Sequence, residues 1–360
     1  MNLRTIGRPC IAALALGLSA CASIGPGSVQ RDRIDYVGAV SESWKEQTLL
    51  NIVRMRYGDA PAFLDVSSVI SSYTLQAQAS AAGQAGAAAL GTFGNAAIGG
   101  VYIDRPTISY TPLAGDKFTK SLLNPIPPSS IFELTQAGFP VDRVLQLTTR
   151  AVNGVYNRSS LGGRSRDADP EFYPLLDALR RLQLSEAVSL RLEKHGGEEA
   201  AVLVLMREQV SPEVQKDMQF VRTTLNVKPT AGGELKVVFG ALPRGSDELA
   251  VLSRSMLEIL LEISSGVEVP GQDVSQGRTG PSGRLAAAQD KRDRPLVNIH
   301  SGASAPAGAF SAVRYRDTWY WIDDGDINSK ITFTFLMMFF SLAETGVTPQ
   351  APVLTVPAGG

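Results

Sequence analysis

No charged side chain interrupts residues 66–103, which read VSSVISSYTLQAQASAAGQAGAAALGTFGNAAIGGVYI. At 73–81 apolar or small residues alternate with Thr, Gln and Ser, a period-two pattern that is typical of a β-strand. The same alternation returns at 107–111, and the intervening residues 83–100 are rich in Gly and Ala. The stretch therefore predicts two strands that are joined by a loop of small residues.

We weigh two interpretations of this hairpin. In the first, it contacts a membrane or another copy of the chain: small residues recur every fourth position, and strands of about 9–11 residues are long enough to cross a bilayer when tilted. In the second, it is a surface loop or a strand pair with a mobile Gly/Ala tip. The first interpretation assigns the contacts to Tyr73, Leu75, Gly83, Gly91, Gly99, Ile108 and Tyr110.

The remainder of the chain mixes helical and strand patterns. Helices are predicted over residues 35–57, 141–156, 170–193, 211–226, 246–264 and 329–344, and strands or hairpins over 200–206, 234–240 and 310–323. In the helix at 211–226, Ser211 is the expected N-cap and Pro212 the first helical residue. We therefore expect an α+β fold, with one compact domain that carries the Gly/Ala-rich hairpin as an insertion. Its expected parts are a domain at 35–265 with the insertion at 66–111, a linker or long loop at 266–295, a C-terminal hairpin plus buried helix at 296–346, and a tail at 347–360.

Composition narrows the class of function. The chain of 360 residues carries 34 Lys+Arg against 35 Asp+Glu, a net charge of −1. This balance excludes the broad basic field on which non-specific nucleic-acid binders depend. Two cysteines and two histidines are too few for a Cys/His zinc cluster or a disulfide scaffold. We expect neither a cofactor nor a nucleic-acid partner.

Two short segments carry candidate chemistry. His300 and Ser301 suggest a hydrolase pair, although neighbouring residues of a strand point to opposite faces. Asp324, Asp326 and Asn328 have the alternating spacing that begins a calcium loop, but the sixth and twelfth positions hold Ser and Phe. A polar turn in which Asn328 or Ser329 caps the following helix explains this second segment better. We assign no catalytic, cofactor-binding or metal-binding residue.

The amino-terminal residues have the order of an export signal. Arg4 and Arg8 precede a short apolar stretch, which ends in Leu18-Ser19-Ala20-Cys21. This ending resembles the bacterial lipobox; a plain secretory peptide with a chance cysteine is the alternative. The resemblance implies that residues 1–20 are a lipoprotein signal peptide and that Cys21 is the palmitate-bearing first residue of the mature protein. Residues 21–34 would then be a flexible tether.

The resemblance also implies a location and a partner. Lipoproteins without Asp after the lipidated cysteine are sorted to the outer membrane, so we expect a lipid-anchored protein on its periplasmic face. The body resembles uncharacterised proteobacterial envelope lipoproteins. Our first hypothesis is a non-catalytic interaction or assembly component of the cell envelope, which binds an envelope protein or itself. The alternatives are an oligomeric lipoprotein whose 66–111 hairpins form an outer-membrane channel or secretion pore, similar in plan to curli-secretion lipoproteins, and an envelope hydrolase.

Overall fold

The structure is a computed structural model that divides into two units. Residues Ala62–Leu113 form one unit, called the insertion below, and the rest of the chain forms the other, called the body. The fold is mixed α+β, as the sequence predicts. The structure describes residues 29–70, 73–84, 93–104, 107–112, 115, 118–160, 166–195, 198–205, 210–281 and 295–343.

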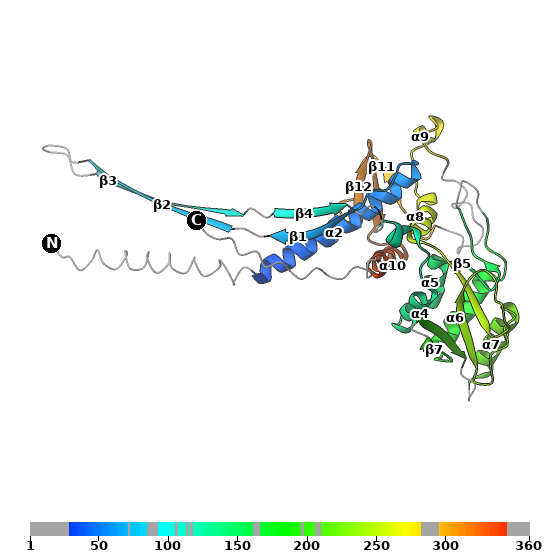
Figure 1. Cartoon of the computed structure of the whole chain (residues 1–360). Coiled ribbons are helices and arrows are strands. Elements are labelled where there is room, and N and C mark those ends of the chain that lie inside the picture. Colours follow the sequence, from blue (N-terminus) through cyan, green and yellow to red (C-terminus); the bar gives the residue numbers. More distant parts are fainter. Residues whose placement is uncertain are drawn as a thin grey trace. The chain divides into compact units, whose positions relative to one another are not determined.

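A six-stranded sheet is the centre of the body, with strand order β6-β5-β10-β9-β8-β7 (Figure 1). Only β9 and β10 pair in parallel; the remaining pairings of this sheet are antiparallel. The central strand β10 is buried on both faces, since Leu249, Ala250 and Val251 are each at most 4% exposed. The strands are β5 (Thr149–Val152), β6 (Val155–Tyr156), β7 (Val188–His195), β8 (Glu198–Leu205), β9 (Glu234–Phe239) and β10 (Glu248–Ser253).

Four helices pack beside this sheet and beside one another in chain order (Figure 1). They are α4 (Pro128–Gln136), α5 (Val141–Thr148), α6 (Phe172–Leu184) and α7 (Pro212–Thr224). The start of α7 follows the sequence closely: Ser211 accepts a hydrogen bond from the backbone N–H of Val214, and Pro212 occupies the first helical position.

A long helix and a small sheet complete the body. Helix α2 (Val29–Arg56) contacts α8 (Met256–Ser265) and strand β12 (Ala309–Tyr315). Strand β12 belongs to a three-stranded sheet of order β11-β13-β12, with β11 at His300–Gly302 and β13 at Thr318–Asp323. The other elements are the π-helical segment η3 (Thr119–Leu123), α9 (Gly271–Ser275) and α10 (Ile327–Ala343).

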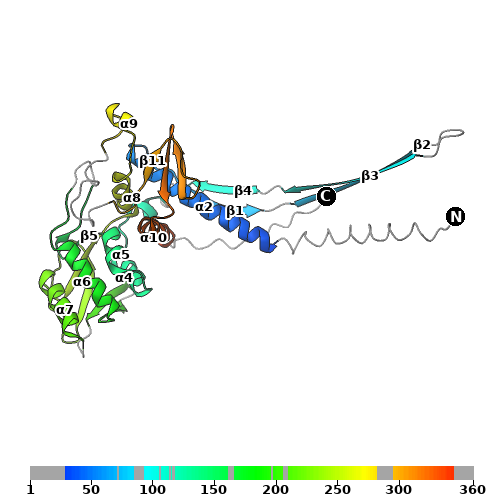
Figure 2. The same cartoon turned by 180° about the vertical axis from the view of Figure 1, so that it is seen from behind.

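The insertion consists of two antiparallel ladders. Strand β1 (Leu64–Ile70) pairs with β4 (Thr107–Pro112), and β2 (Tyr73–Gln84) pairs with β3 (Phe93–Asp104). Figure 2 shows β2 and β3 side by side along their whole length. The β2–β3 register is unbroken over 12 residue pairs, from Tyr73↔Asp104 to Gln84↔Phe93. A hairpin is therefore present, but not in the predicted pairing. Its second strand, β3, begins at Phe93, inside the stretch 83–100 that was predicted as a loop, and the predicted strand at 107–111 pairs with β1 instead.

Three predicted helices are partly strands. The predicted helix 141–156 ends at Thr148, because the chain becomes extended at Thr149 and residues 149–152 pair with β10 as strand β5. Asn153 and Gly154, which both adopt positive φ, then turn the chain into β6. The predicted helix 170–193 ends at Leu184, and residues from Val188 form β7. In the predicted helix 246–264, residues 248–253 form β10, and the helix begins only after Ser255, which makes a capping box with Glu258.

Two expected flexible segments contain helix. Helix α2 begins at Val29, inside the stretch predicted as a tether at 21–34, because the residues that follow Val29 include the good helix formers Gln30 and Arg31. The predicted linker 266–295 contains α9, and its residues 282–294 lie outside the described residues. The signal peptide and the tail at 347–360 also lie outside them.

Candidate functional site

The predicted contact residues of the insertion fall on its two ladders. Tyr73, Leu75, Gly83 and Gly99 lie in β2 or β3, opposite Asp104, Tyr102, Gly94 and Gln78 respectively. Ile108 and Tyr110 lie in β4, opposite Val69 and Val66, and both side chains are exposed. Gly91 and Cys21 lie outside the described residues. The structure thus brings six of the seven predicted contact residues together in one unit.

His300 faces two carboxylates. Its Nδ1 lies 3.1 Å from Glu268 Oε1, and its Nε2 lies 3.4 Å from Asp323 Oδ2. His300 and Ser301 are successive residues of β11, opposite Trp321 and Tyr320, so their side chains leave opposite faces of the strand. This geometry does not favour a His300–Ser301 hydrolase pair.

The acidic turn before α10 is held by contacts within the protein. Asp326 Oδ1 accepts a hydrogen bond from the backbone N–H of Ser329, so Asp326 caps α10 in place of the predicted Asn328 or Ser329. Asp324 forms an ion pair with Lys330, and Asn328 accepts a hydrogen bond from Arg143. Within the described ranges, no three His, Cys, Asp or Glu side chains are grouped so that they could hold a metal ion.

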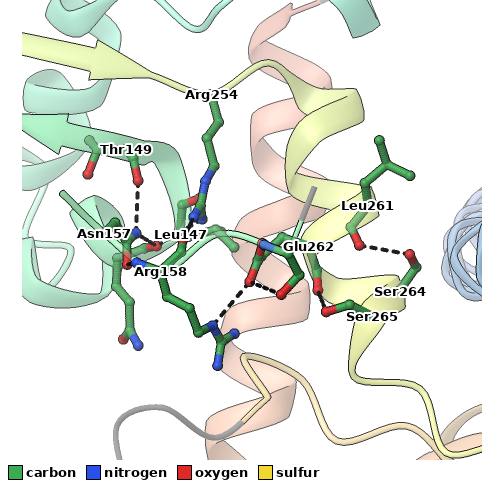
Figure 3. Close-up of polar contacts among 11 residues, drawn as sticks. Leu147, Thr149, Asn157, Arg158, Arg254, Leu261, Glu262, Ser264 and Ser265 are labelled. Atoms are coloured by element: carbon green, nitrogen blue, oxygen red, sulfur yellow. Dashed lines mark hydrogen bonds and ion pairs between the residues drawn. The ribbon is translucent and has the colours of Figure 1, made fainter. Parts of the chain in front are cut away.

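A buried polar network joins β10, α8 and the segment after β6 (Figure 3). Arg254, at the end of β10, donates to the carbonyl oxygens of Leu147, Gln146 and Arg158. Glu262 on α8 accepts from Arg158 Nε at 3.1 Å and from the backbone N–H of Ser160 at 2.7 Å. Burial lowers the pKa of Arg254. Because its members are satisfied by one another, this network stabilises the body and leaves no donor set for a ligand.

A second buried cluster joins α2, α9 and the small sheet. The Tyr57 hydroxyl lies 2.6 Å from both Asp273 Oδ2 and Tyr320 Oη, and Arg278 Nη1 lies 2.9 Å from Asp273 Oδ1. The hydrogen bond from Tyr57 holds the pKa of Asp273 below its ordinary value, whereas burial raises the pKa values of Tyr57 and Tyr320. These hydrogen bonds connect α9 to the end of α2. The polar atoms of the cluster bond to one another, as expected for a structural contact.

A cavity of about 710 Å³ lies between the four helices α4–α7 and the large sheet. The sheet contributes Leu203, Leu235 and Leu249; the register Leu203↔Leu235 places the first two on the same face. The helices contribute apolar side chains such as Leu145, and the exposed part of the lining holds both polar residues, such as Gln136 and Glu186, and the apolar Leu184. Pockets of this size and composition are the usual binding sites for small ligands.

Sequence reasoning missed this cavity, because its walls come from nine separate helices and strands. No short motif marks it, and its apolar lining residues have the appearance of ordinary core in the sequence. The one available signal is the cluster of polar residues at 135–142 and 180–189 beside apolar helix faces.

None of the helices among the described residues combines the length and the apolarity that a membrane-spanning helix has. Comparison of the chain with protein-family models, with curated proteins and with solved structures finds no match.

Proposed function

We propose that the protein is a non-catalytic, lipid-anchored component of the bacterial cell envelope that assembles through its insertion. The Leu18–Cys21 lipobox supports the anchor, on the periplasmic face of the outer membrane. The β2–β3 ladder supports the assembly role, and it is the observation on which the proposal rests.

The ladder has the properties of an association surface. Among the described residues, β2 and β3 form a sheet of only two strands, so the outer edge of each strand presents backbone N–H and C=O groups that the ladder does not pair. Sheets of two strands are marginally stable alone in water. Natural edge strands commonly carry charges that oppose pairing, and no charged residue occurs between Tyr73 and Ile103. Pairing with a neighbouring copy on each side would satisfy both edges.

The size of the detergent-extracted protein tests the assembly role. The full chain should elute as an oligomer in size-exclusion chromatography with light scattering. Ala79→Lys on β2 and Ala97→Lys on β3 should shift it toward the monomer, because a lysine on an edge strand opposes strand pairing. Thr223→Lys, on the exposed surface of α7, is the matched control and should leave the oligomer intact. A wild-type chain that is monomeric after extraction would contradict the proposal.

A ring of insertions that lines an outer-membrane channel is the second candidate function. The observation that favours it is length: β2 and β3 have 12 residues each, and about 9–11 suffice for a tilted strand to cross a bilayer. Release of a trapped dye from vesicles that contain the purified oligomer tests it. Release that is lost in Ala79→Lys supports a channel, and an oligomer that releases no dye supports assembly alone.

The anchor is tested independently by mass spectrometry of the amino-terminal peptide of the mature protein. Acyl groups on Cys21 are expected. A bare thiol or a retained leader would remove the membrane location from the proposal.

A further inference from the structure

The cavity between α4–α7 and the large sheet is too large to be a packing defect. Protein interiors are packed about as densely as organic crystals, with few voids larger than a water molecule. The space here measures about 710 Å³, which lies in the range of about 300–1,000 Å³ that is typical of ligand pockets. The cavity is open to solvent at its rim, so a ligand can enter a space of this size.

The walls of the cavity favour an apolar occupant. Its deep lining includes Leu145, Val221, Leu225 and Leu235, each at most 2% exposed to solvent. Water in such surroundings finds too few hydrogen-bond partners, so apolar cavities take up hydrocarbon readily.

The polar rim supplies one cation. The polar residues that line the cavity are Thr135, Gln136, Arg180, Gln183, Glu186 and Ser189. The amide of Gln183 is fully engaged: its oxygen accepts from the backbone N–H of Val141 and from Arg180, and its nitrogen donates to the carbonyl oxygens of Thr135 and Phe139. Gln183 therefore holds the polar residues of the rim in place, and its amide has no hydrogen-bonding capacity left for a ligand.

Arg180 is available to an acidic headgroup. Its Nη1 donates to Gln183 and its Nε lies 3.9 Å from Asp142 Oδ1, while among the described residues its Nη2 has no hydrogen-bond partner. The side chain is 32% exposed, so a bound carboxylate or phosphate could reach it from the solvent. Glu186 on the same rim disfavours an acid at its own position, which places the headgroup on the Arg180 side.

We infer that this cavity binds an acyl chain, with the acidic headgroup of the lipid or fatty acid at Arg180. This site is separate from the insertion and does not depend on the assembly role. The chain has two sources, a free lipid of the envelope or an acyl group on Cys21 of the protein itself.

Photolabelling of the full-length protein in its membranes tests the inference. A photoreactive palmitic acid is added, the sample is irradiated, and labelled peptides are identified by mass spectrometry. Label is expected in the peptides that contain Leu145, Val221 and Leu235. Label confined to residues 62–113, or spread evenly over the exposed surface, would overturn the inference.

Two pairs of variants sharpen the result. Leu235→Trp fills the cavity and should abolish the cavity label, whereas Leu242→Trp, at an exposed side chain outside the lining, should retain it. Arg180→Gln should weaken competition by unlabelled palmitic acid about tenfold, the effect of losing a charge-assisted hydrogen bond. Arg181→Gln should leave the competition unchanged, because its hydrogen-bond partner Asp217 is not one of the residues that line the cavity. Equal labelling of Leu235→Trp and the wild type would show that the acyl chain does not bind in this cavity. Should Leu235→Trp fail to fold, the Arg180→Gln comparison decides.

A third arm identifies the source of the chain. If the acyl group on Cys21 fills the cavity, the wild-type protein labels weakly and Cys21→Ala labels strongly. If a free lipid fills it, both proteins label alike. Absence of cavity label in both would overturn the inference.

Discussion

Arg158 and Glu262 form an ion pair that is almost completely buried. Arg158 Nε lies 3.1 Å from Glu262 Oε1, and the two side chains are 8% and 1% exposed. The pair joins the segment after β6 to helix α8, at the point where Arg254 reaches the last carbonyl groups of α5 (Figure 3). Removing one side chain of the pair would leave the other charge buried without its ion-pair partner, so such a variant is expected to be destabilised.

Glu262→Gln should lower the free energy of unfolding by about 3–5 kcal/mol, because Arg158 then remains charged and buried without its partner. Chemical denaturation followed by circular dichroism measures the loss. Asp317→Asn removes the carboxylate of an exposed ion pair with Arg314 and serves as the control, with essentially unchanged stability. Equal stability of the two variants would show that the buried pair is dispensable.

Arg254→Lys should destabilise the body although the charge is kept. The guanidinium donates to three carbonyl oxygens from two nitrogens, and a lysine offers one compact ammonium group in their place. The expected loss is about 1–3 kcal/mol, the cost of carbonyl groups left buried without donors. Thermal and chemical denaturation measure it. Arg150→Lys, at a more exposed position, should be as stable as the wild type. An Arg254→Lys variant of wild-type stability would show that the three hydrogen bonds from the guanidinium are not required.

The stability contributed by Asp273 should depend on pH in the acid range. Its pKa is lowered in the folded state, first by the hydrogen bond from Tyr57 and then by Arg278. A lowered pKa contributes stability above the unfolded value of about 3.9, and this contribution disappears as the pH falls through the folded pKa.

The difference in free energy of unfolding between wild type and Asp273→Asn should therefore be largest near neutral pH and narrow below about pH 4. Urea denaturation over a pH series measures it. Tyr57→Phe, which removes the donor and keeps the carboxylate, should show the same narrowing with a smaller amplitude. A difference in free energy of unfolding that stays constant with pH would show that the ionised Asp273 carboxylate does not stabilise the folded state.

Gly154→Ala should destabilise the turn between β5 and β6 by about 1–2 kcal/mol, because Gly154 has a φ of 81°, in the left-handed region. An added Cβ would also lie 2.9 Å from the side chain of Leu242. Gly271→Ala is the control: an added Cβ there meets no atom within 4 Å. Melting temperatures of the two variants test the prediction, and equal values would contradict it.

Local patterns predicted some elements well and others poorly. The alternation at 73–81 predicted β2, and Ser211-Pro212 predicted the start of α7, because both signals lie in consecutive residues. The segment 246–264 looked helical, yet residues 248–253 pair in parallel with β9. A short apolar run that is buried on both faces fits a strand or a helix equally, and only its distant partner decides.

The cavity and the buried network could not be predicted for a related reason. Arg158 is separated from Arg254 by 96 positions and from Glu262 by 104, and charged residues in a sequence are normally taken as surface. Their burial depends on tertiary contacts that no local pattern records. The same holds for the cavity, where Leu145 and Leu235 would each be expected to contact other core side chains.

The pairing of Leu64 with Pro112 has a consequence for how this chain can change. The two ends of the insertion lie opposite each other in the β1–β4 ladder, so residues 62–113 form a cassette whose ends meet. Such a cassette can be excised and replaced by a short turn, or transplanted into the surface loop of a different host, without altering the path of the surrounding chain. The two units are thus free to evolve at different rates.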